Sequence, residues 1–477
     1  MHKPQKTITM TKDEKYKLAD QVIEHAIKNG AQQVSVSIDE SRSNNIEIRN
    51  KQIDRLTESN TLGLSLSLYV DKKYSAHSTN RLKKEDLFKF TEEAIAATRY
   101  LAEDDYRKLP EPELYYKGGG SDPGKLDKSL DSVNPKIKIG MATQVHDEAF
   151  GLDERIISVS AYYSDNISNS VMVTSNGFRG DSADSGVSLS ASVAMKGETS
   201  RPSDYWYESA IFMDKLIKTG IGKKALERTI RKLDPKKIKS GSYAMIVDNM
   251  AIANLLNPFY SALQGSSLYL KQSFLANKLD KPVGSKLLTV IDDPLIPAAP
   301  GSRLFDGEGL ASTRRTILEN GVLKSFYIDT YYGRKLGMKP TSGSNSNVIV
   351  NPGTRDMASM VNSLKKVILV TGFNGGNCNG STGDFSYGIE GYLVEDGKIV
   401  HPLNEMNITG NMNQLFFNLV EVGNDIKEGS SFRIPSMMFD KPCPHCGSRK
   451  VLSTHFRATD GLTIVRFDGI KVHGWEF

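Results

Sequence analysis

Two of the three cysteines have a spacing that can bind a metal ion or carry redox chemistry. Cys443 and Cys446 flank a Pro-His pair, and the third cysteine, Cys378, lies elsewhere in the chain. The C-x-x-C spacing is that of a redox dithiol or of half a zinc site, which His445 or His455 could complete only poorly. A zinc ribbon needs a second pair, which is absent, and a redox motif opens a helix after a strand, whereas this pair lies in a polar run. We therefore interpret the pair as structural or incidental, with zinc and redox roles as alternatives.

A second candidate region is rich in glycine and asparagine and covers residues 372–388. These residue types allow positive φ angles and close approach of another backbone, so we expect a tightly turned loop that lines a groove. Gly376, Asn377 and Tyr387 are the candidate substrate-binding residues within it. Cys378 could act as a nucleophile, but no histidine lies near it in sequence to serve as its base.

Arg314 and Arg315 follow an acidic stretch that contains Asp306 and Glu308. Opposite charges on adjacent strands or loops favour cross-strand pairing at a sheet edge. The sharper alternative is that the two arginines hold a peptide carboxylate or a peptide backbone. Both arginines are therefore included among the candidate substrate-binding residues.

Several classes of function have no support in the sequence. With 61 basic and 56 acidic residues the net charge is only +5 and no long Lys/Arg block is present, so we expect no nucleic-acid partner. No segment approaches the roughly 18 consecutive apolar residues of a membrane span, and neither a nucleotide-binding loop motif nor a His-Glu pair occurs. The polar N-terminus is unlike a secretory signal and cysteines are sparse, so we expect a cytoplasmic protein without a membrane partner.

The elements that position these residues change in character along the 477-residue chain, which is long enough for about two to four domains. In the first half, apolar residues at helical spacing are followed by segments that alternate in twos, typical of antiparallel strands with one solvated face. This order of a helix and then strands occurs twice. We expect helices at about 15–28, 84–101, 136–150 and 211–233, a loop at 110–123, and strands at 34–38, 46–48, 62–68, 157–161, 171–173 and 187–193.

The second half opens with a strand and a helix that Asp248-Asn249 caps, and then becomes rich in glycine and short alternating strands. Asn320-Gly321 and Asp396-Gly397 predict hairpin turns. The strands are expected at 242–247, 285–291, 314–318, 322–328, 367–371, 388–394 and 398–402.

Together these patterns predict an α+β fold. An N-terminal helix-and-antiparallel-sheet domain is expected over residues 1–235, with two similar halves at about 13–110 and 130–200. A large, mainly-β C-terminal domain is expected over residues 236–477.

Several segments together resemble one family. Residues 311–343, 380–388 (GSTGDFSYG), 391–402 (GYLVEDGKIVHP) and 407–411 (NITGN) look like the TldD/PmbA family, once called modulators of DNA gyrase. The resemblance spans about residues 13–440 and keeps the family's order of segments. It implies a metalloprotease built from two kinds of subunit: a TldD-type catalytic chain with a zinc-binding H-E-x-x-x-H helix, and a PmbA/TldE-type chain without it.

The helix after the strand at 242–247 should be the equivalent of the zinc-binding helix. The two histidine positions then fall on Asn257 and Ala262, and the glutamate position falls on Pro258. Asparagine is a poor zinc ligand, alanine is none, and proline cannot polarise a water molecule. The resemblance therefore implies no metal in the cleft of this chain, and zinc in a TldD-like catalytic partner.

One departure from the family pattern lies near the C-terminus. An insertion at about residues 441–465 contains Cys443 and Cys446, and a family-like ending follows it only at residues 467–474. The resemblance gives no role for this insertion.

We expect a non-catalytic PmbA/TldE-like subunit that pairs with a TldD-like chain to process or degrade unfolded peptides, which could add as a strand to an exposed sheet edge. Two alternatives remain open. The chain could be an autonomous hydrolase that uses Cys378 or a metal at Cys443 and Cys446. It could instead be a non-enzymatic peptide-binding adaptor, as a homodimer or otherwise without a proteolytic partner.

Overall fold

The computed structural model describes residues 10–440, 463–467 and 470–474. The N-terminal half forms one antiparallel six-stranded sheet with the order β3-β2-β1-β4-β5-β6. The predicted α+β fold and the repeated order of a helix followed by strands are confirmed. The elements are α1 (Lys12–Lys28), β1 (Gln33–Arg49), β2 (Gln52–Val70), β3 (Lys73–Thr79), α2 (Lys84–Thr98), the short helices η1 (Pro112–Leu114) and η2 (Lys128–Ser132), α3 (Pro135–Asp147), β4 (Ile156–Thr174), β5 (Arg179–Met195), β6 (Ser203–Ala210) and α4 (Ile221–Ile230).

The central strands are much longer than the sequence pattern predicted. The segments expected at 34–38 and 46–48 are two ends of β1, and β1 turns into β2 at Asn50 and Lys51, which both have positive φ. The middle of β1 is polar and therefore looked like a turn. In the structure it is paired on both sides, with β2 and with β4, which keeps it extended.

Two apolar clusters lie on the helix-covered face of this sheet, and a polar belt separates them. One packs under α1 and α2, and the other packs under α3 and α4. In the belt, the buried Lys15 pairs with Glu40, and the buried Lys138 pairs with Asp165, which also accepts a hydrogen bond from the hydroxyl of Tyr163. Buried charges must be paired, so these contacts explain how a polar middle is tolerated inside long strands.

The predicted long helix at 211–233 is wrong, because only α4 is helical there. Gly220 precedes α4 with a φ of 79°, a left-handed conformation that a continuous helix cannot contain. Glu148, directly after α3, accepts hydrogen bonds from the backbone N–H groups of Gly220 and Gly222. These bonds hold the start of α4 against the end of α3.

The C-terminal half forms a nine-stranded and a five-stranded sheet around a shared apolar core. Its elements are β7 (Ala244–Val247), α5 (Ile252–Ala262), α6 (Gly265–Tyr269), β8 (Val290–Asp292), β9 (Arg315–Glu319), β10 (Val322–Leu323), α7 (Thr330–Leu336), β11 (Val348–Val350), α8 (Met357–Asn362), β12 (Lys366–Cys378), β13 (Asp384–Glu395), β14 (Lys398–Pro402), β15 (Met406–Asn411), α9 (Met412–Leu415), η3 (Phe416–Asn418), β16 (Leu419–Val422), β17 (Phe432–Arg433), β18 (Met437–Phe439), β19 (Thr463–Phe467) and β20 (Ile470–Gly474).

Most of the strand predicted at 285–291 is wrong, since the strand there, β8, begins only at Val290. The segment before it turns back on itself, with the N–H of Leu288 donating to the carbonyl of Ser285. The strand predicted at 322–328 is likewise only β10, two residues long. Both predicted hairpin turns are confirmed, because Asn320, Gly321, Asp396 and Gly397 all have positive φ.

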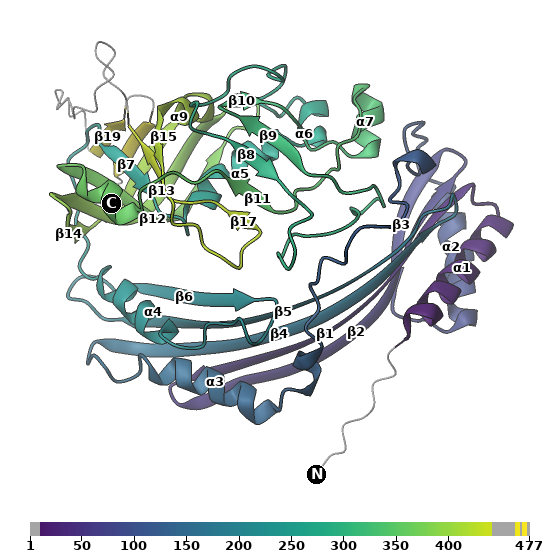
Figure 1. The fold of residues 1–477 in the computed structure, drawn as a ribbon, viewed down its shortest axis with the longest axis horizontal. Coiled ribbons are helices and arrows are strands. Elements are labelled where there is room, and N and C mark those ends of the chain that lie inside the picture. The colour runs from purple at the N-terminus through teal and green to yellow at the C-terminus, as the bar shows by residue number, and fades with distance from the viewer. Residues whose placement is uncertain (1–9, 441–462, 468–469, 475–477) are drawn as a thin grey trace.

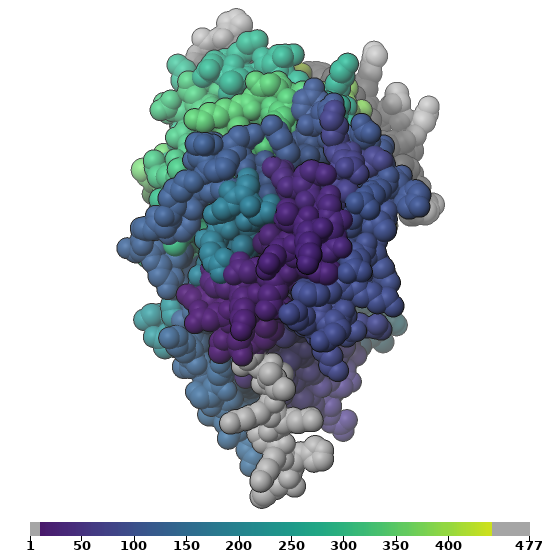
Figure 2. Space-filling view, turned by 90° about the vertical axis from the view of Figure 1, so that its right-hand side faces the viewer, coloured from purple at the N-terminus to yellow at the C-terminus, as the bar shows by residue number. Residues whose placement is uncertain are grey.

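The two halves form a curved sheet and a domain that spans its hollow side. Figure 1 shows the C-terminal domain above the concave face of the sheet and α1, α2 and α3 outside it. Figure 2 looks onto the end of the molecule that α1 covers, with the C-terminal domain stacked above. Arg334 on α7 ties the halves together by donating to the carbonyls of Lys108 and Leu109 and pairing with Glu111. Among the described helices, none combines the length and the apolar character needed to cross a membrane.

Candidate functional site

The glycine-rich segment 372–388 is a hairpin rather than the predicted loop. β12 and β13 pair from Lys366 through Cys378 with two irregularities in register, and a short turn connects them. The amide oxygen of Asn379 stabilises this turn by accepting from the N–H groups of Ser381 and Thr382. The local composition favoured a loop, but the two ends of the segment pair with each other as strands, and this pairing determines the structure.

Gly376 shows why a glycine-rich strand is required here. Its φ is 112°, and a Cβ atom at this position would lie 2.0 Å from the carbonyl oxygen of Ser386 on β13. Only glycine permits this close approach. The hairpin therefore depends on backbone shape at a position where side chains are excluded.

One edge of β12 is unpaired in its second half. β7 pairs with β12 through Val367–Val370, and from Gly372 to Cys378 β13 is the only strand among the described residues that pairs with β12. Within the described part of the chain, no other backbone group bonds to this outer edge. Residues 374–377 are exposed, so an extended chain could pair with the edge.

Three of the predicted substrate-binding residues meet on this hairpin. Gly376 lies opposite Tyr387, and Asn377 lies opposite Ser386 on the neighbouring strand. The ring of Tyr387 contacts the ring of Phe373, and burial raises the pKa of its phenol to about 12. Tyr387 therefore stays neutral at physiological pH and can offer a hydroxyl and an apolar ring to a ligand.

Cys378 is the last residue of β12, and its environment keeps the thiol protonated instead of activating it. Burial, with a further contribution from the negative charge of Asp384, raises the pKa of its thiol to about 11. Its Sγ lies 3.7 Å from the carbonyl oxygen of Asn379. A nucleophilic cysteine needs a lowered pKa or an adjacent base, so this geometry disfavours a catalytic role.

The positions predicted for a degenerate zinc motif lie on α5, which packs on the C-terminal core. Asn257 is exposed, whereas Ala262 is only 1% exposed and belongs to that core. An amide side chain is a poor zinc ligand and a methyl group is none, so neither position supplies an imidazole. Pro258 lies inside the helix and offers no ligand atom on its side chain. These residues do not fit a zinc ion.

Arg315 begins β9 on the other C-terminal sheet and Arg314 directly precedes it, but the two side chains have different contacts. Arg315 donates to the buried Asp292 at 2.8 Å and to the carbonyls of Ser342 and Ser344, so its guanidinium is already engaged within the chain. Arg314 has a side chain that is 57% exposed and pairs with Asp293 at 3.4 Å. Holding a ligand is therefore geometrically open to Arg314 and not to Arg315.

The C-x-x-C pair lies outside the described residues, as do His445 and His455 and most of the predicted insertion at 441–465. Within the ranges that the structure describes, no group of three or more His, Cys, Asp or Glu side chains is placed to hold a metal ion.

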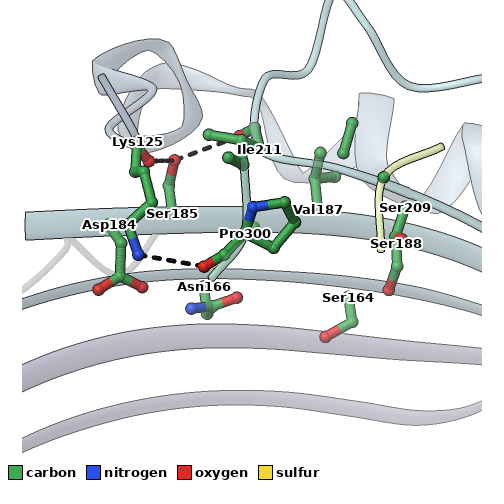
Figure 3. A pocket seen from close by; sticks show the side chains of 13 residues that line it. Lys125, Ser164, Asn166, Asp184, Ser185, Val187, Ser188, Ser209, Ile211 and Pro300 are labelled. Atoms are coloured by element: carbon green, nitrogen blue, oxygen red, sulfur yellow. Dashed lines mark hydrogen bonds between the residues drawn. The ribbon is translucent and has the colours of Figure 1, made fainter. Parts of the chain in front are cut away.

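A cavity of about 340 Å³ that the sequence analysis did not anticipate lies between the two halves. Figure 3 shows its floor on β4, β5 and β6 and its roof at Pro300, whose carbonyl accepts from Lys125 at 3.2 Å. The alternating serines of residues 187–193 predicted a solvated strand face, but not that another domain would cover it. The lining residues are Lys125, Ser164, Asn166, Asp184, Ser185, Gly186, Val187, Ser188, Ser209, Ala210, Ile211, Pro300 and Gly429.

Comparison with known families accounts for nearly the whole chain. Models of the PmbA/TldA metallopeptidase domain 1, central domain and C-terminal domain match residues 34–98, 128–233 and 240–442. A solved protein from Bacteroides thetaiotaomicron, described as a candidate modulator of DNA gyrase, is 47% identical with a TM-score of 0.88, over 90% of this chain and 98% of that chain. The chain belongs to the PmbA/TldD family.

Other family members extend this relationship at lower identity. The metalloprotease PmbA homolog of Haemophilus influenzae is 29% identical over 88% of this chain and 93% of its own length, and the metalloprotease PmbA of Escherichia coli O157:H7 is 25% identical over 84% and 90%. The crystal structure of TldE from Thermococcus kodakarensis shares the fold, with a TM-score of 0.79 at 19% identity over 88% of this chain and 98% of that chain. This PmbA/TldD family chain thus resembles proteins named as metalloproteases while α5 offers no zinc ligands.

Proposed function

We propose that this chain is a PmbA/TldE-type, non-catalytic subunit of a TldD/TldE-type metalloprotease assembly that processes or degrades unfolded peptides. The observation that supports the proposal is the chemistry of α5, where an exposed asparagine, a proline and a buried alanine lie at the positions that the resemblance assigns to the motif. A zinc protease needs ligands and a general base on such a helix. The catalytic zinc therefore belongs to a TldD-like partner carrying H-E-x-x-x-H.

The contribution of this chain is a surface for an extended substrate. The outer edge of β12 between Gly372 and Cys378 offers backbone N–H and C=O groups to an added strand, in register with Asn377 and beside Tyr387. Pairing through the main chain depends little on sequence, which suits unfolded peptides. The raised thiol pKa of Cys378 argues against the alternative of an autonomous cysteine hydrolase.

Co-expression with an H-E-x-x-x-H sibling from the same genome tests the proposal. We expect a stable hetero-oligomer with metal-dependent peptidase activity that neither chain shows alone, and we expect Cys378→Ala to retain that activity. If the chains elute separately at micromolar concentration and the sibling is fully active alone, the proposal fails and the peptide-binding adaptor, including a homodimer, becomes the better account.

A further inference from the structure

The floor of the interdomain cavity is a set of short hydrogen-bonding side chains on the concave face of the N-terminal sheet. Ser164 on β4, Ser188 on β5 and Ser209 on β6 are consecutive cross-strand partners, and Asn166 lies opposite Gly186 in the next row. Further along β5, the alternate residues Leu189, Ala191 and Val193 belong to the core beneath α3 and α4. The floor is therefore mainly polar and lies on three paired strands, of which β6 is the edge strand.

Several of these groups have hydrogen-bonding capacity left. Among the described residues, the hydroxyls of Ser188 and Ser209 and the amide of Asn166 bond to no other side chain or backbone group, whereas the hydroxyl of Ser164 donates to Asn45 at 2.8 Å. Gly186 keeps the space open, because a Cβ atom there would lie 2.9 Å from Oδ1 of Asn166. The floor thus presents unused donors and acceptors to whatever enters.

The roof is fixed to the N-terminal half on both sides of the cavity, to the loop at Pro123 and to β6. On one side, the N–H of Ala298 donates to the carbonyl of Pro123. On the other side, the amino group of Lys427 donates to the carbonyl of Tyr207, and a Cβ atom at Gly429 would lie 2.6 Å from the carbonyl oxygen of Ser209. These contacts hold the C-terminal domain over the floor, so the space is a partly open cavity between the two halves.

The lining chemistry selects the class of ligand. Small-molecule pockets are lined mainly by hydrophobic and aromatic side chains. Among the described residues that line this cavity none is aromatic, and the polar ones outnumber the four apolar ones, Val187, Ala210, Ile211 and Pro300. Its volume of about 340 Å³ lies at the low end of the pocket range, and a helix about 10–12 Å wide is a poor match for it. A narrow ligand with regularly repeated hydrogen-bonding groups is favoured.

An extended polypeptide has this repeat. Side chains on one face of a strand recur about every 6.6 Å, and an extended peptide repeats its N–H and C=O groups on one side at the same spacing. A peptide lying along β4 and β5 therefore meets a floor group at every second residue. The lining includes one acidic residue, Asp184, and one basic residue, Lys125, so the net charge of a peptide gives little selectivity.

We propose that this cavity is a second subsite for unfolded polypeptide, which holds an extended, neutral segment by its main chain on the concave sheet. The proposal rests on the proposed function for its substrate class and adds a place on the N-terminal half, separate from the β12 edge. Polypeptide bound at both places would be held by the two domains at once, which lengthens the recognised segment without requiring a sequence motif.

The test measures binding of a fluorescein-labelled, neutral, unstructured 12-residue peptide of Ser, Gly, Asn and Thr to the full chain by anisotropy. Ser188→Trp fills the cavity, and Ser192→Trp is the matched control, because Ser192 lies on the same face of β5 outside the lining. We expect Ser188→Trp to weaken binding roughly tenfold or more, as loss of several hydrogen bonds and of space would do, and Ser192→Trp to change it less than about twofold. Equal affinities for both variants would overturn the proposal.

A second measurement covers the case in which Ser188→Trp fails to fold. In a background with Cys378, Cys443 and Cys446 replaced by serine, Ser188→Cys and Ser192→Cys are exposed to the same peptide carrying an activated disulfide. Preferential cross-linking at position 188, suppressed by unlabelled peptide, is expected. Equal cross-linking at both positions, or suppression by a neutral oligosaccharide and not by peptide, would overturn the proposal. Neither assay needs a partner chain or zinc, so a chain that binds peptide here but never joins a sibling would defeat the proposed function alone.

Discussion

Arg315 and the outer edge of β12 lie in the same C-terminal domain, but they differ in the hydrogen-bonding capacity they have left. The guanidinium of Arg315 is bound to Asp292 and to two backbone carbonyls, while the backbone of β12 from Gly372 to Cys378 has no partner on one side within the described chain. The charged residue stabilises the fold, and the uncharged edge is available to another chain. Of the two, only the unpaired backbone keeps hydrogen-bonding groups that another chain could use.

The largest expected effect distinguishes the two arginines. Arg315→Ala leaves the carboxylate of Asp292 buried at 1% exposure without its cation, and should lower the free energy of unfolding by about 3 to 5 kcal/mol. Arg314→Ala removes an exposed pair and should cost at most about 1 kcal/mol. Urea unfolding followed by fluorescence measures both. Similar losses of unfolding free energy in the two variants would contradict the contrast between a buried, structural arginine and an exposed one.

The reactivity of the Cys378 thiol, at the end of β12, shows whether this edge could take part in catalysis as well as in peptide binding. The pKa of Cys378 is raised from about 9 to about 11, so folding retains the proton, and the associated stability is present below pH 9 and is lost as pH rises towards 11. In a Cys443→Ser/Cys446→Ser variant, iodoacetamide should alkylate the folded chain at pH 8 about 100-fold more slowly than the unfolded chain. Fast alkylation at neutral pH would show an activated thiol and favour the hydrolase alternative.

Gly376 and Gly375 test whether the edge depends on backbone shape. Both have positive φ, but a Cβ atom at Gly376 would meet the carbonyl oxygen of Ser386 at 2.0 Å, whereas a Cβ atom at Gly375 has nothing within 4 Å. Gly376→Ala should therefore destabilise the protein by about 1 to 3 kcal/mol more than Gly375→Ala does. Hydrogen exchange of the β12 and β13 amides should accelerate more in the first variant than in the second. Equal losses of stability in the two variants would mean that the close approach to Ser386 is not what requires glycine at position 376.

The smallest expected effect is on catalysis. Cys378→Ala should leave the peptidase activity of the assembly with its sibling within about twofold, since the protonated thiol supplies no nucleophile. Initial rates on an unfolded polypeptide measure it. If activity is lost while the assembly still forms, Cys378 takes part in catalysis and the β12 edge belongs to the active site.

Local signals in the sequence predicted local structure well. The residue pairs that form the turns at Asn320-Gly321 and Asp396-Gly397 act within a few residues, and the structure confirms these turns. The full length of β1 could not be predicted, because its polar middle is held by Lys15 and by strands far along the chain.

The β12–β13 hairpin and the interdomain cavity could not be predicted either, because both depend on contacts between residues that are apart in the sequence. The pairing of β12 with β13 is set by backbone contacts across the hairpin that composition does not encode, so a strand looked like a loop. The cavity floor brings together residues of three strands, among them Ser164 and Ser209, under a loop that contains Pro300. No local sequence pattern predicts that this loop covers them. The roles of Gly376, Asn377, Tyr387 and Arg314 as substrate-binding residues stay predictions.

The central claim is that the catalytic metal belongs to the partner, and zinc stoichiometry tests it most directly. A Cys443→Ser/Cys446→Ser variant removes the pair that lies outside the described residues, and native mass spectrometry then counts zinc in this chain alone, in the H-E-x-x-x-H sibling alone and in their complex. The account predicts no zinc in this chain, and in the complex only the zinc carried by the sibling. Stoichiometric zinc in this chain alone, lost on substitution of residues around α5, would contradict it.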